Sequence, residues 1–363
     1  MNLAPFKAQT AIFDRYLASN LASATLTVLF VLLAIFSFFA FIEEMEEIGK
    51  GNYTISTAIF VVLLKIPGLV YQLLPISALI GCLLGLGSMT ERGELAVVRC
   101  AGVSKAGVLK SVSKVGLYLV LATAFVGDFV YPQAEQRAES LRNLALDGKP
   151  HKAGVRGFWA MDRGSYVNIA TVLPEEIRDI RIFKFDKELN LQTALFAKRG
   201  YFQGDSWKLH DIEKTIFSEG QIITSSNDIE TWESTLAPDL LAMSAIEPDS
   251  LTTAALFRYI RFAKDNGLDS RLWETGLWSK IGGPLATGTM VFLTLPLVLG
   301  TMSQRVSSGR RVLFGSFVGL GFYMFNQTAS HVGVVLEVPS YVTALGPTGL
   351  LALCGVILFS RVS

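Results

Sequence analysis

The stretch LASATLTVLFVLLAIFSFFAF, residues 21–41, contains no charged side chain. A helix needs roughly 20 apolar residues to cross a hydrocarbon core about 30 Å thick, so this stretch is long enough to span a membrane. The rest of the chain is of the same kind, because 51% of its 363 residues are hydrophobic and only 17% are charged. That composition is too apolar for an ordinary soluble protein, and we expect an α-helical membrane protein.

Five further segments are apolar enough to be spans. The second is longer than a bilayer requires, so it must tilt, kink or protrude, and Pro67 and Pro75 would supply the kinks. We therefore expect six transmembrane helices in two groups of three. They are residues 21–41, 57–86, 109–130, 277–302, 312–328 and 341–359.

The charges of the short loops predict the orientation, since loops rich in lysine and arginine stay in the cytoplasm. The loop after the first expected span, EEMEEIGK, is acidic, and the loop after the fifth has only His331 and Glu337. Both termini and the basic loops should therefore be cytoplasmic. The basic loop residues are Arg92, Arg99, Lys105, Lys110 and Lys114 after the second span, and Arg305, Arg310 and Arg311 after the fourth.

Residues 131–276 differ sharply from the spans on either side. Short runs of alternating polarity, broken by Gly, Asp, Asn and Pro, predict strands of an all-β sandwich or roll. Two flanking segments, 132–146 and 250–267, read as helices, and the second has an apolar face that would suit the bilayer surface. The expected layout is residues 1–130 with three spans, an external β domain at 131–276, and three spans at 277–363. The strand runs are YVNIATV, IRIFKF, LQTALFAKRGYF, WKLHDI and QIITSS.

Neither catalysis nor metal binding is indicated by any motif. The sequence has no phosphate loop, no H-E-x-x-H and no nucleophile elbow, so we expect a non-enzymatic chain that does not itself hydrolyse ATP. The three cysteines lie in or beside apolar spans, and the three histidines are scattered, so we expect neither a disulfide framework nor a metal site. A net charge of +1 argues against a nucleic-acid partner.

The stretch GLGSMTERGELAVVRCAGVSK, residues 85–105, interrupts the apolar segments with charges. Ser88 followed by Glu91 fits a capping box at a helix start, and Gly102 fits a helix stop. Ser104 fits the start of the next helix. We expect a short cytoplasmic helix over about 89–101.

That expected helix would place Leu95 and Val98 three residues apart on one face. Glu91, Glu94 and Arg99 would be available beside them as charged contacts. Apolar anchors flanked by charges suit docking into a groove on a partner protein. The alternative is an ordinary cytoplasmic turn with solvated charges.

Four stretches of this chain, LGLGSMTERGELAVVRCAGVSK, GFWAMDRGSYVNI, LWSKIGGPL and DRYL, together with the 3 + β domain + 3 layout, resemble the LptF/LptG family of lipopolysaccharide export permeases. The resemblance covers essentially the whole chain, and two of the stretches are more similar to LptG members than to LptF members. It implies a β-jellyroll outside the membrane and a coupling helix that sits in a groove of the cytoplasmic ATPase LptB. Glu94 matches the acidic position of that coupling helix.

The resemblance also implies a function. The chain would be a permease subunit of an ABC transporter in the inner membrane of a Gram-negative bacterium. Paired with LptF and driven by an LptB dimer that binds the ATP, it would extract lipopolysaccharide from the outer leaflet of that membrane. The lipid would then pass to the jellyroll of LptC and toward the outer membrane, with this chain's β domain in the periplasm.

Three basic residues are candidates for holding the lipid phosphates: Lys65, Arg137 and Arg142. Lys65 lies within the second expected span near its external end, where a cation either snorkels to the membrane surface or meets an anion. Arg142 matches a basic position of the family, although a solvated helix face is the alternative. Relatives can carry a lysine near the external end of the first span, where this chain has Ala40 followed by glutamates.

Two other classes of protein are alternatives. A membrane-anchored scaffold or signalling module would use its β domain to bind a periplasmic partner. A proton-driven transporter would need acidic residues inside the spans, where only Asp128 near an external end qualifies. The pairs Gly81 with Gly85 and Gly315 with Gly319 fit close helix packing, or a sliding interface between subunits.

Overall fold

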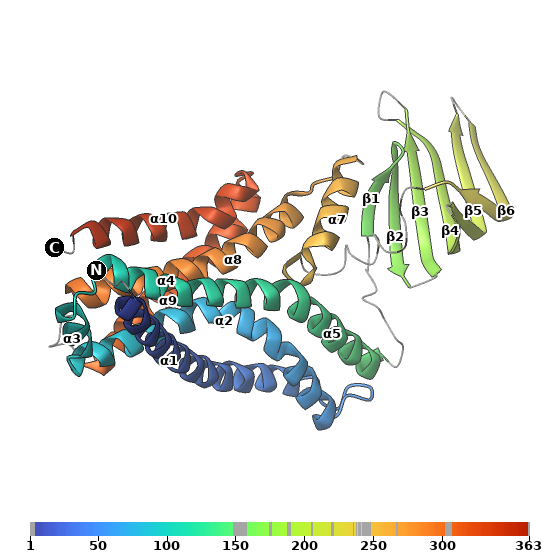
Figure 1. Ribbon diagram of the computed structural model, residues 1–363. Helices are drawn as coiled ribbons and strands as arrows, with labels where there is room; N and C mark the ends of the chain where they lie inside the picture. The colour runs from blue at the N-terminus through green and yellow to red at the C-terminus, as the bar shows by residue number, and fades with distance from the viewer. Residues whose placement is uncertain are drawn as a thin grey trace. The chain divides into compact units, whose positions relative to one another are not determined.

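The computed structural model of the protein forms two compact units. One contains Met1–Glu46, Val62–Glu135 and Glu274–Ser363, and the other contains Glu47–Val61 and Gln136–Trp273. Figure 1 shows the first as a bundle of long helices and the second as the unit that carries the strands β1 to β6. The structure describes residues 4–147, 158–173, 176–186, 190–204, 206–218, 221–234, 236, 238, 241, 248–265, 268–301 and 307–361.

Eight α-helices and two π-helical turns contribute to the helical unit within the described residues. The helices are α1 (Ala4–Met45), α2 (Ile55–Glu91), α3 (Glu94–Cys100), α4 (Lys105–Phe125), α5 (Tyr131–Asp147), α8 (Arg271–Pro296), α9 (Ser308–Val335) and α10 (Ser340–Arg361). The π-helical turns are η1 (Val126–Val130), which joins α4 to α5, and η3 (Leu297–Thr301), which follows α8.

Five described segments are long and apolar enough to cross a membrane, and each contains most or all of one expected span. The remaining expected span, 312–328, is the fifth along the chain and lies within α9, which is a continuous 28-residue helix but is not among those five. Its crossing of the membrane therefore stays a prediction, and Met302, the last residue of the fourth expected span, lies outside the described residues. The five are Ile12–Met45, Ile55–Glu91, Ala106–Leu146, Arg271–Gly300 and Ser340–Arg361.

Glycines allow α2 to pack closely against two other helices. A Cβ on Gly81 would collide with the Thr25 backbone of α1, and a Cβ on Gly85 would lie 2.9 Å from Leu21 Cδ2. On the α9 side, a Cβ on Gly315 would lie 2.9 Å from Leu83 Cδ1 and one on Gly319 would lie 3.0 Å from Ile76 Cγ2. These glycines therefore serve helix packing within the chain, which is the simpler of the two expected roles.

The second unit is built on one six-stranded antiparallel sheet with the strand order β1-β2-β3-β4-β5-β6. The alternating runs in the sequence correctly predicted β2 to β6, and β1 was missed. Each described strand pairs with its neighbour in sequence, so the described strands form a meander. The strands are β1 (Phe158–Asp162), β2 (Ser165–Val172), β3 (Glu176–Phe185), β4 (Leu191–Gln203), β5 (Ser206–Ser218) and β6 (Gln221–Trp232).

One face of this sheet carries the core of the unit. Trp207 is fully buried in it, and its indole N–H donates to the Leu236 carbonyl at 2.7 Å, which satisfies the one polar group of the ring. At the surface of β3, the Arg178 guanidinium donates to both carboxylate oxygens of Glu176 and holds the pKa of Glu176 below its ordinary value. The β domain is therefore a packed unit with its own apolar interior.

The helix expected at 250–267 is α7 (Thr253–Asp265). The sequence suggested that its apolar face lies on the bilayer surface. In the structure this face is instead buried within the protein. Phe262 joins the core of the sheet, and Tyr259 stacks on Trp273 with ring centroids 4.3 Å apart. Burial raises the pKa of Tyr259 to about 12.

Candidate functional site

The charged stretch between α2 and α4 forms a short helix that starts later than expected. A single helix over 89–101 is wrong, since α2 continues to Glu91 and α3 begins at Glu94. The break lies at Gly93, whose φ of 74° is a left-handed conformation that glycine adopts without steric cost. Ser88 is therefore inside α2, where its hydroxyl donates to the Gly85 carbonyl and caps nothing.

The other end of this stretch agrees with the sequence. Gly102 follows α3 with a φ of 94°, as a glycine that ends a helix commonly does. Ser104 then caps α4, because its hydroxyl oxygen accepts from the Gly107 backbone N–H at 3.2 Å. The expected helix stop and restart are both confirmed.

Glu94 is the first residue of α3 and has two polar neighbours. The Tyr16 hydroxyl on α1 donates to Glu94 Oε2 at 3.0 Å, and Arg92 Nη1 lies 3.6 Å from Oε1. The carboxylate also lies at the positive end of the short helix, which favours a negative charge. Glu94 is thus oriented by its own chain while its side chain is still 29% exposed.

The expected apolar anchors of α3 differ in where they lie. Leu95 is buried in the core of the helical unit, Val98 is partly buried, and Arg99 is exposed in the last turn. Leu95 therefore holds α3 onto its own chain. The large apolar side chain that α3 presents outward is Val97, which is 69% exposed and which sequence reasoning missed.

Glu91, the last residue of α2, binds a buried cation. Arg311 Nη1, in the first turn of α9, donates to Glu91 Oε1 at 2.9 Å. The Arg311 side chain is 0% exposed, while that of Glu91 is 36% exposed. The sequence indicated Arg311 only as one of the positive charges of a loop. No sequence pattern indicated that its side chain is buried.

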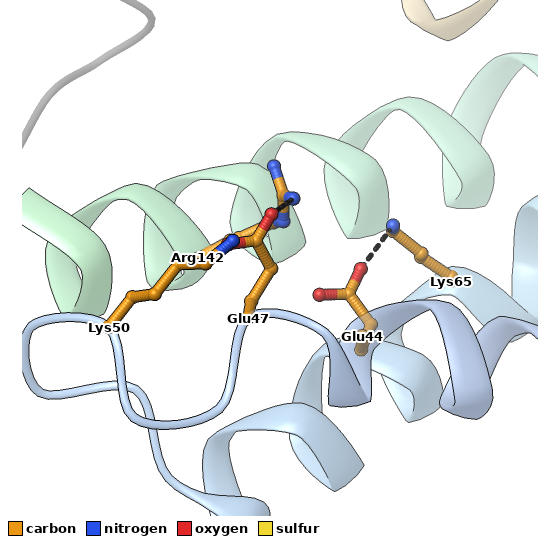
Figure 2. Close-up of polar contacts among 5 residues, drawn as sticks. All are labelled: Glu44, Glu47, Lys50, Lys65 and Arg142. Atoms are coloured by element: carbon orange, nitrogen blue, oxygen red, sulfur yellow. Dashed lines mark hydrogen bonds and ion pairs between the residues drawn. The ribbon is translucent and has the colours of Figure 1, made fainter.

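Lys65 on α2 pairs with an anion of its own chain. Its Nζ lies 2.8 Å from Glu44 Oε1 near the end of α1, as Figure 2 shows. The Glu44 side chain is only 4% exposed and that of Lys65 is 26% exposed. One of the glutamates after the first span therefore positions this lysine.

Arg142 on α5 belongs to the other compact unit and is also paired. Its Nη2 lies 3.0 Å from Glu47 Oε1, and Lys50 Nζ lies 2.8 Å from Glu47 Oε2 (Figure 2). One carboxylate is thus shared by two cations. Arg137 is exposed on α5, and no ion pair of it is found within the described residues.

The described residues contain no group of three His, Cys, Asp or Glu side chains that could hold a metal ion. In the helical unit the polar contacts instead gather around α3 and Lys65, and in the other unit Arg142 and Lys50 contact Glu47 (Figure 2). Ion pairs of this kind fix helix ends and can bind charged groups.

Comparison with known proteins gives a consistent result over nearly the whole chain. The family model described as lipopolysaccharide export system permease LptF/LptG matches residues 15–361. The lipopolysaccharide export system permease protein LptG of Escherichia coli K12 is 31% identical over 356 residues, covering 97% of this chain and 99% of the relative. The protein of the same name from Haemophilus influenzae is 32% identical over 338 residues, covering 92% of this chain and 94% of the relative.

Proposed function

The chain belongs to the LptF/LptG family of lipopolysaccharide export permeases, and we propose that it extracts lipopolysaccharide from the outer leaflet of the inner membrane as the LptG-type subunit of an ATP-driven transporter. The family and the apolar helices make it a multi-pass protein of the inner membrane. In this proposal it pairs with LptF, is driven by an LptB dimer that binds the ATP, and delivers the lipid to LptC. The observation that carries it is the match of the family over residues 15–361.

The contact with the ATPase is assigned to α3 on the cytoplasmic side. Val97 and Arg99 are exposed on this helix, and Glu94 at its start is held by Tyr16 but still reaches the surface. An exposed apolar side chain beside charges of both signs suits a groove on a partner. Leu95 is buried in the core of the helical unit, so a displacement of α3 by the ATPase would also displace the helices packed around Leu95.

The lipid phosphates are assigned to Lys65, Arg142 and Arg137. A lysine ammonium has three donors, and one of those of Lys65 goes to Glu44, so a phosphate oxygen can still bind the ammonium. Glu44 fixes the position of Lys65 and at the same time reduces its net attraction for an anion. Arg142 and Lys50 both contact Glu47, so a lipid phosphate that approaches this carboxylate would meet two basic side chains.

The β domain is assigned to the periplasm, where it passes the lipid on. In the order of the described strands, β1 and β6 are the edges of the sheet, and β6 is exposed along most of its length. The backbone groups of an edge strand can pair with a strand of another chain. Such pairing would let the sheet continue into a β domain of LptC.

The experiment that tests this function uses membrane vesicles with the purified complex and measures lipopolysaccharide extracted per ATP hydrolysed. Replacing Glu94→Lys should abolish ATP-dependent extraction while the chain still inserts, because a cation now stands where the carboxylate was. The matched charge reversal Glu213→Lys, at an exposed site on β5, should leave extraction unchanged. Unchanged extraction by the Glu94→Lys variant would refute the role of α3.

The same preparation separates the permease from the membrane-anchored scaffold. A permease of this kind should co-purify with an ATPase that has a phosphate loop. A scaffold whose β domain binds a periplasmic partner has no reason to bring down an ATPase through α3.

A further inference from the structure

Arg311 is the most deeply buried charged residue among those that the structure describes. Its side chain is 0% exposed, although a guanidinium stays charged at any physiological pH and is costly to remove from water. Its neighbour Arg310 in the same turn of α9 is exposed. Burial at this position therefore calls for specific contacts.

Those contacts are one ion pair and one tightly fitted glycine. Arg311 donates through Nη1 to Glu91 Oε1, and no acceptor for Nε or Nη2 is found among the described residues. The guanidinium lies on Gly87 of α2, where a Cβ would come within 2.8 Å of both Cδ and Cζ of Arg311. A side chain larger than hydrogen at position 87 would displace the arginine.

The same edge of α9 continues against α2 beyond the arginine. Gly315 and Gly319 follow at intervals of four residues, and a Cβ on them would meet Leu83 and Ile76 at 2.9 and 3.0 Å. Gly319, Gly315 and Arg311 thus contact α2 one after another, and Arg311 makes the contact closest to Glu91, at the end of α2. Glu91 is followed after two residues by α3.

We propose that Arg311 is a positioning residue for ATP coupling, which joins the first turn of α9 to the end of α2 that carries α3. This inference rests on the proposed function. When the ATPase displaces α3, the Arg311–Glu91 pair makes α9 move together with α2. Arg311 uses only Nη1 to bond Glu91, and its Nε and Nη2 donors have no acceptor among the described residues. When the two helices move, the guanidinium can therefore stay hydrogen-bonded to Glu91 through another of its N–H groups.

The first test replaces the buried cation by an apolar side chain of similar length. In the complex carrying Arg311→Met, the ATPase should still co-purify and hydrolyse ATP within about twofold of the normal rate, whereas lipid extracted per ATP should fall by about tenfold or more. Arg310→Met, at the exposed neighbour, is the matched control and should extract normally. Normal extraction per ATP by the Arg311→Met variant would overturn the inference and leave the proposed function intact.

The second test reads the connection directly and needs no transport. Spin labels are placed on the native Cys100 of α3, which is exposed, and on Gly309→Cys of α9, where the structure leaves open space, with Cys354→Ser to remove the other exposed thiol. The distance distribution between the labels should be narrow with normal Arg311 and broad with Arg311→Met or Arg311→Lys. Equal widths in all three would contradict the inference. If no ATPase co-purifies at all, the proposed function fails, and the label distances still report the connection.

Discussion

Two ion pairs of the helical unit bury opposite members. In Arg311–Glu91 the cation is fully buried and the carboxylate is 36% exposed. In Lys65–Glu44 the carboxylate is buried at 4% exposure and the lysine is 26% exposed. Both pairs involve α2, one at its last residue and one within its first half. The same helix therefore presents an anion at one site and a cation at the other.

This difference suggests what each site can meet. A buried charge is held by its surroundings, and its more exposed partner is the group that a second molecule can reach. Glu91 would meet positive groups of a protein, as expected close to the ATPase, and Lys65 would meet negative groups, such as lipid phosphates. The asymmetry of the two pairs thus agrees with a transporter that receives force at one site and binds lipid at another.

The largest expected effect comes from removing the exposed member of the first pair. Glu91→Ala leaves the guanidinium of Arg311 buried without its partner and should lower the free energy of unfolding by about 3 kcal/mol. Arg311→Met removes the buried charge itself and should be nearly neutral, since apolar replacement of a buried charge is tolerated. Unfolding in mixed micelles at increasing dodecyl sulfate measures both, and equal losses would show that burial does not distinguish the partners.

Removing the more exposed member of the Lys65–Glu44 pair should also destabilise the protein, but by less. Lys65→Met removes the ammonium that neutralises the buried carboxylate of Glu44, and we expect a loss of about 1–3 kcal/mol. The loss is smaller than for Glu91→Ala because a carboxylate can take up a proton, whereas a guanidinium cannot lose one. The same dodecyl sulfate titration provides the comparison, and a larger loss for Lys65→Met than for Glu91→Ala would reverse the ranking.

The contacts of α2 with α1 and with α9 should also differ in how much free energy of unfolding is lost when a glycine is enlarged. Gly81→Ala would drive a methyl group into the Thr25 backbone between α1 and α2 and should cost about 1–3 kcal/mol. A Cβ at Gly315, between α2 and α9, would meet the side chains of Leu83 and Ile80 at 2.9 and 3.2 Å, and side chains yield more easily than backbone, so we expect Gly315→Ala to cost less than about 1 kcal/mol. Gly321→Ala faces open space and is the control. Similar losses of unfolding free energy for Gly81→Ala and Gly315→Ala would mean that both interfaces accommodate an added methyl group equally well.

The parts of the fold that follow from local pattern were predictable from the sequence. Apolar length indicated the spans, and alternation of polar and apolar residues indicated β2 to β6. The order of strands in a sheet depends on long-range pairing, which local alternation does not specify. The meander therefore emerged only in the structure.

The candidate site was predictable to a smaller degree. Gly102 and Ser104 ended and restarted helices as expected, while Ser88 did not cap one because the apolar packing of α2 carries the helix on to Glu91. Which face of α3 turns inward depends on the rest of the bundle, so Leu95 and Val97 could not be told apart. The ion pair of Arg311 joins residues 220 positions apart, and one sequence gives no signal of that contact.

A photoreactive side chain at position 97 of α3 provides the most direct test of the transporter interpretation. Val97 is 69% exposed, and Ile222 on β6, which is 71% exposed, is the matched control site in the other unit. Irradiation of membranes should link position 97, and not position 222, to an ATPase with a phosphate loop, identified by mass spectrometry. Capture of lipid alone at position 97, or of the ATPase at position 222, would contradict the assignment of α3 as the site where the ATPase acts.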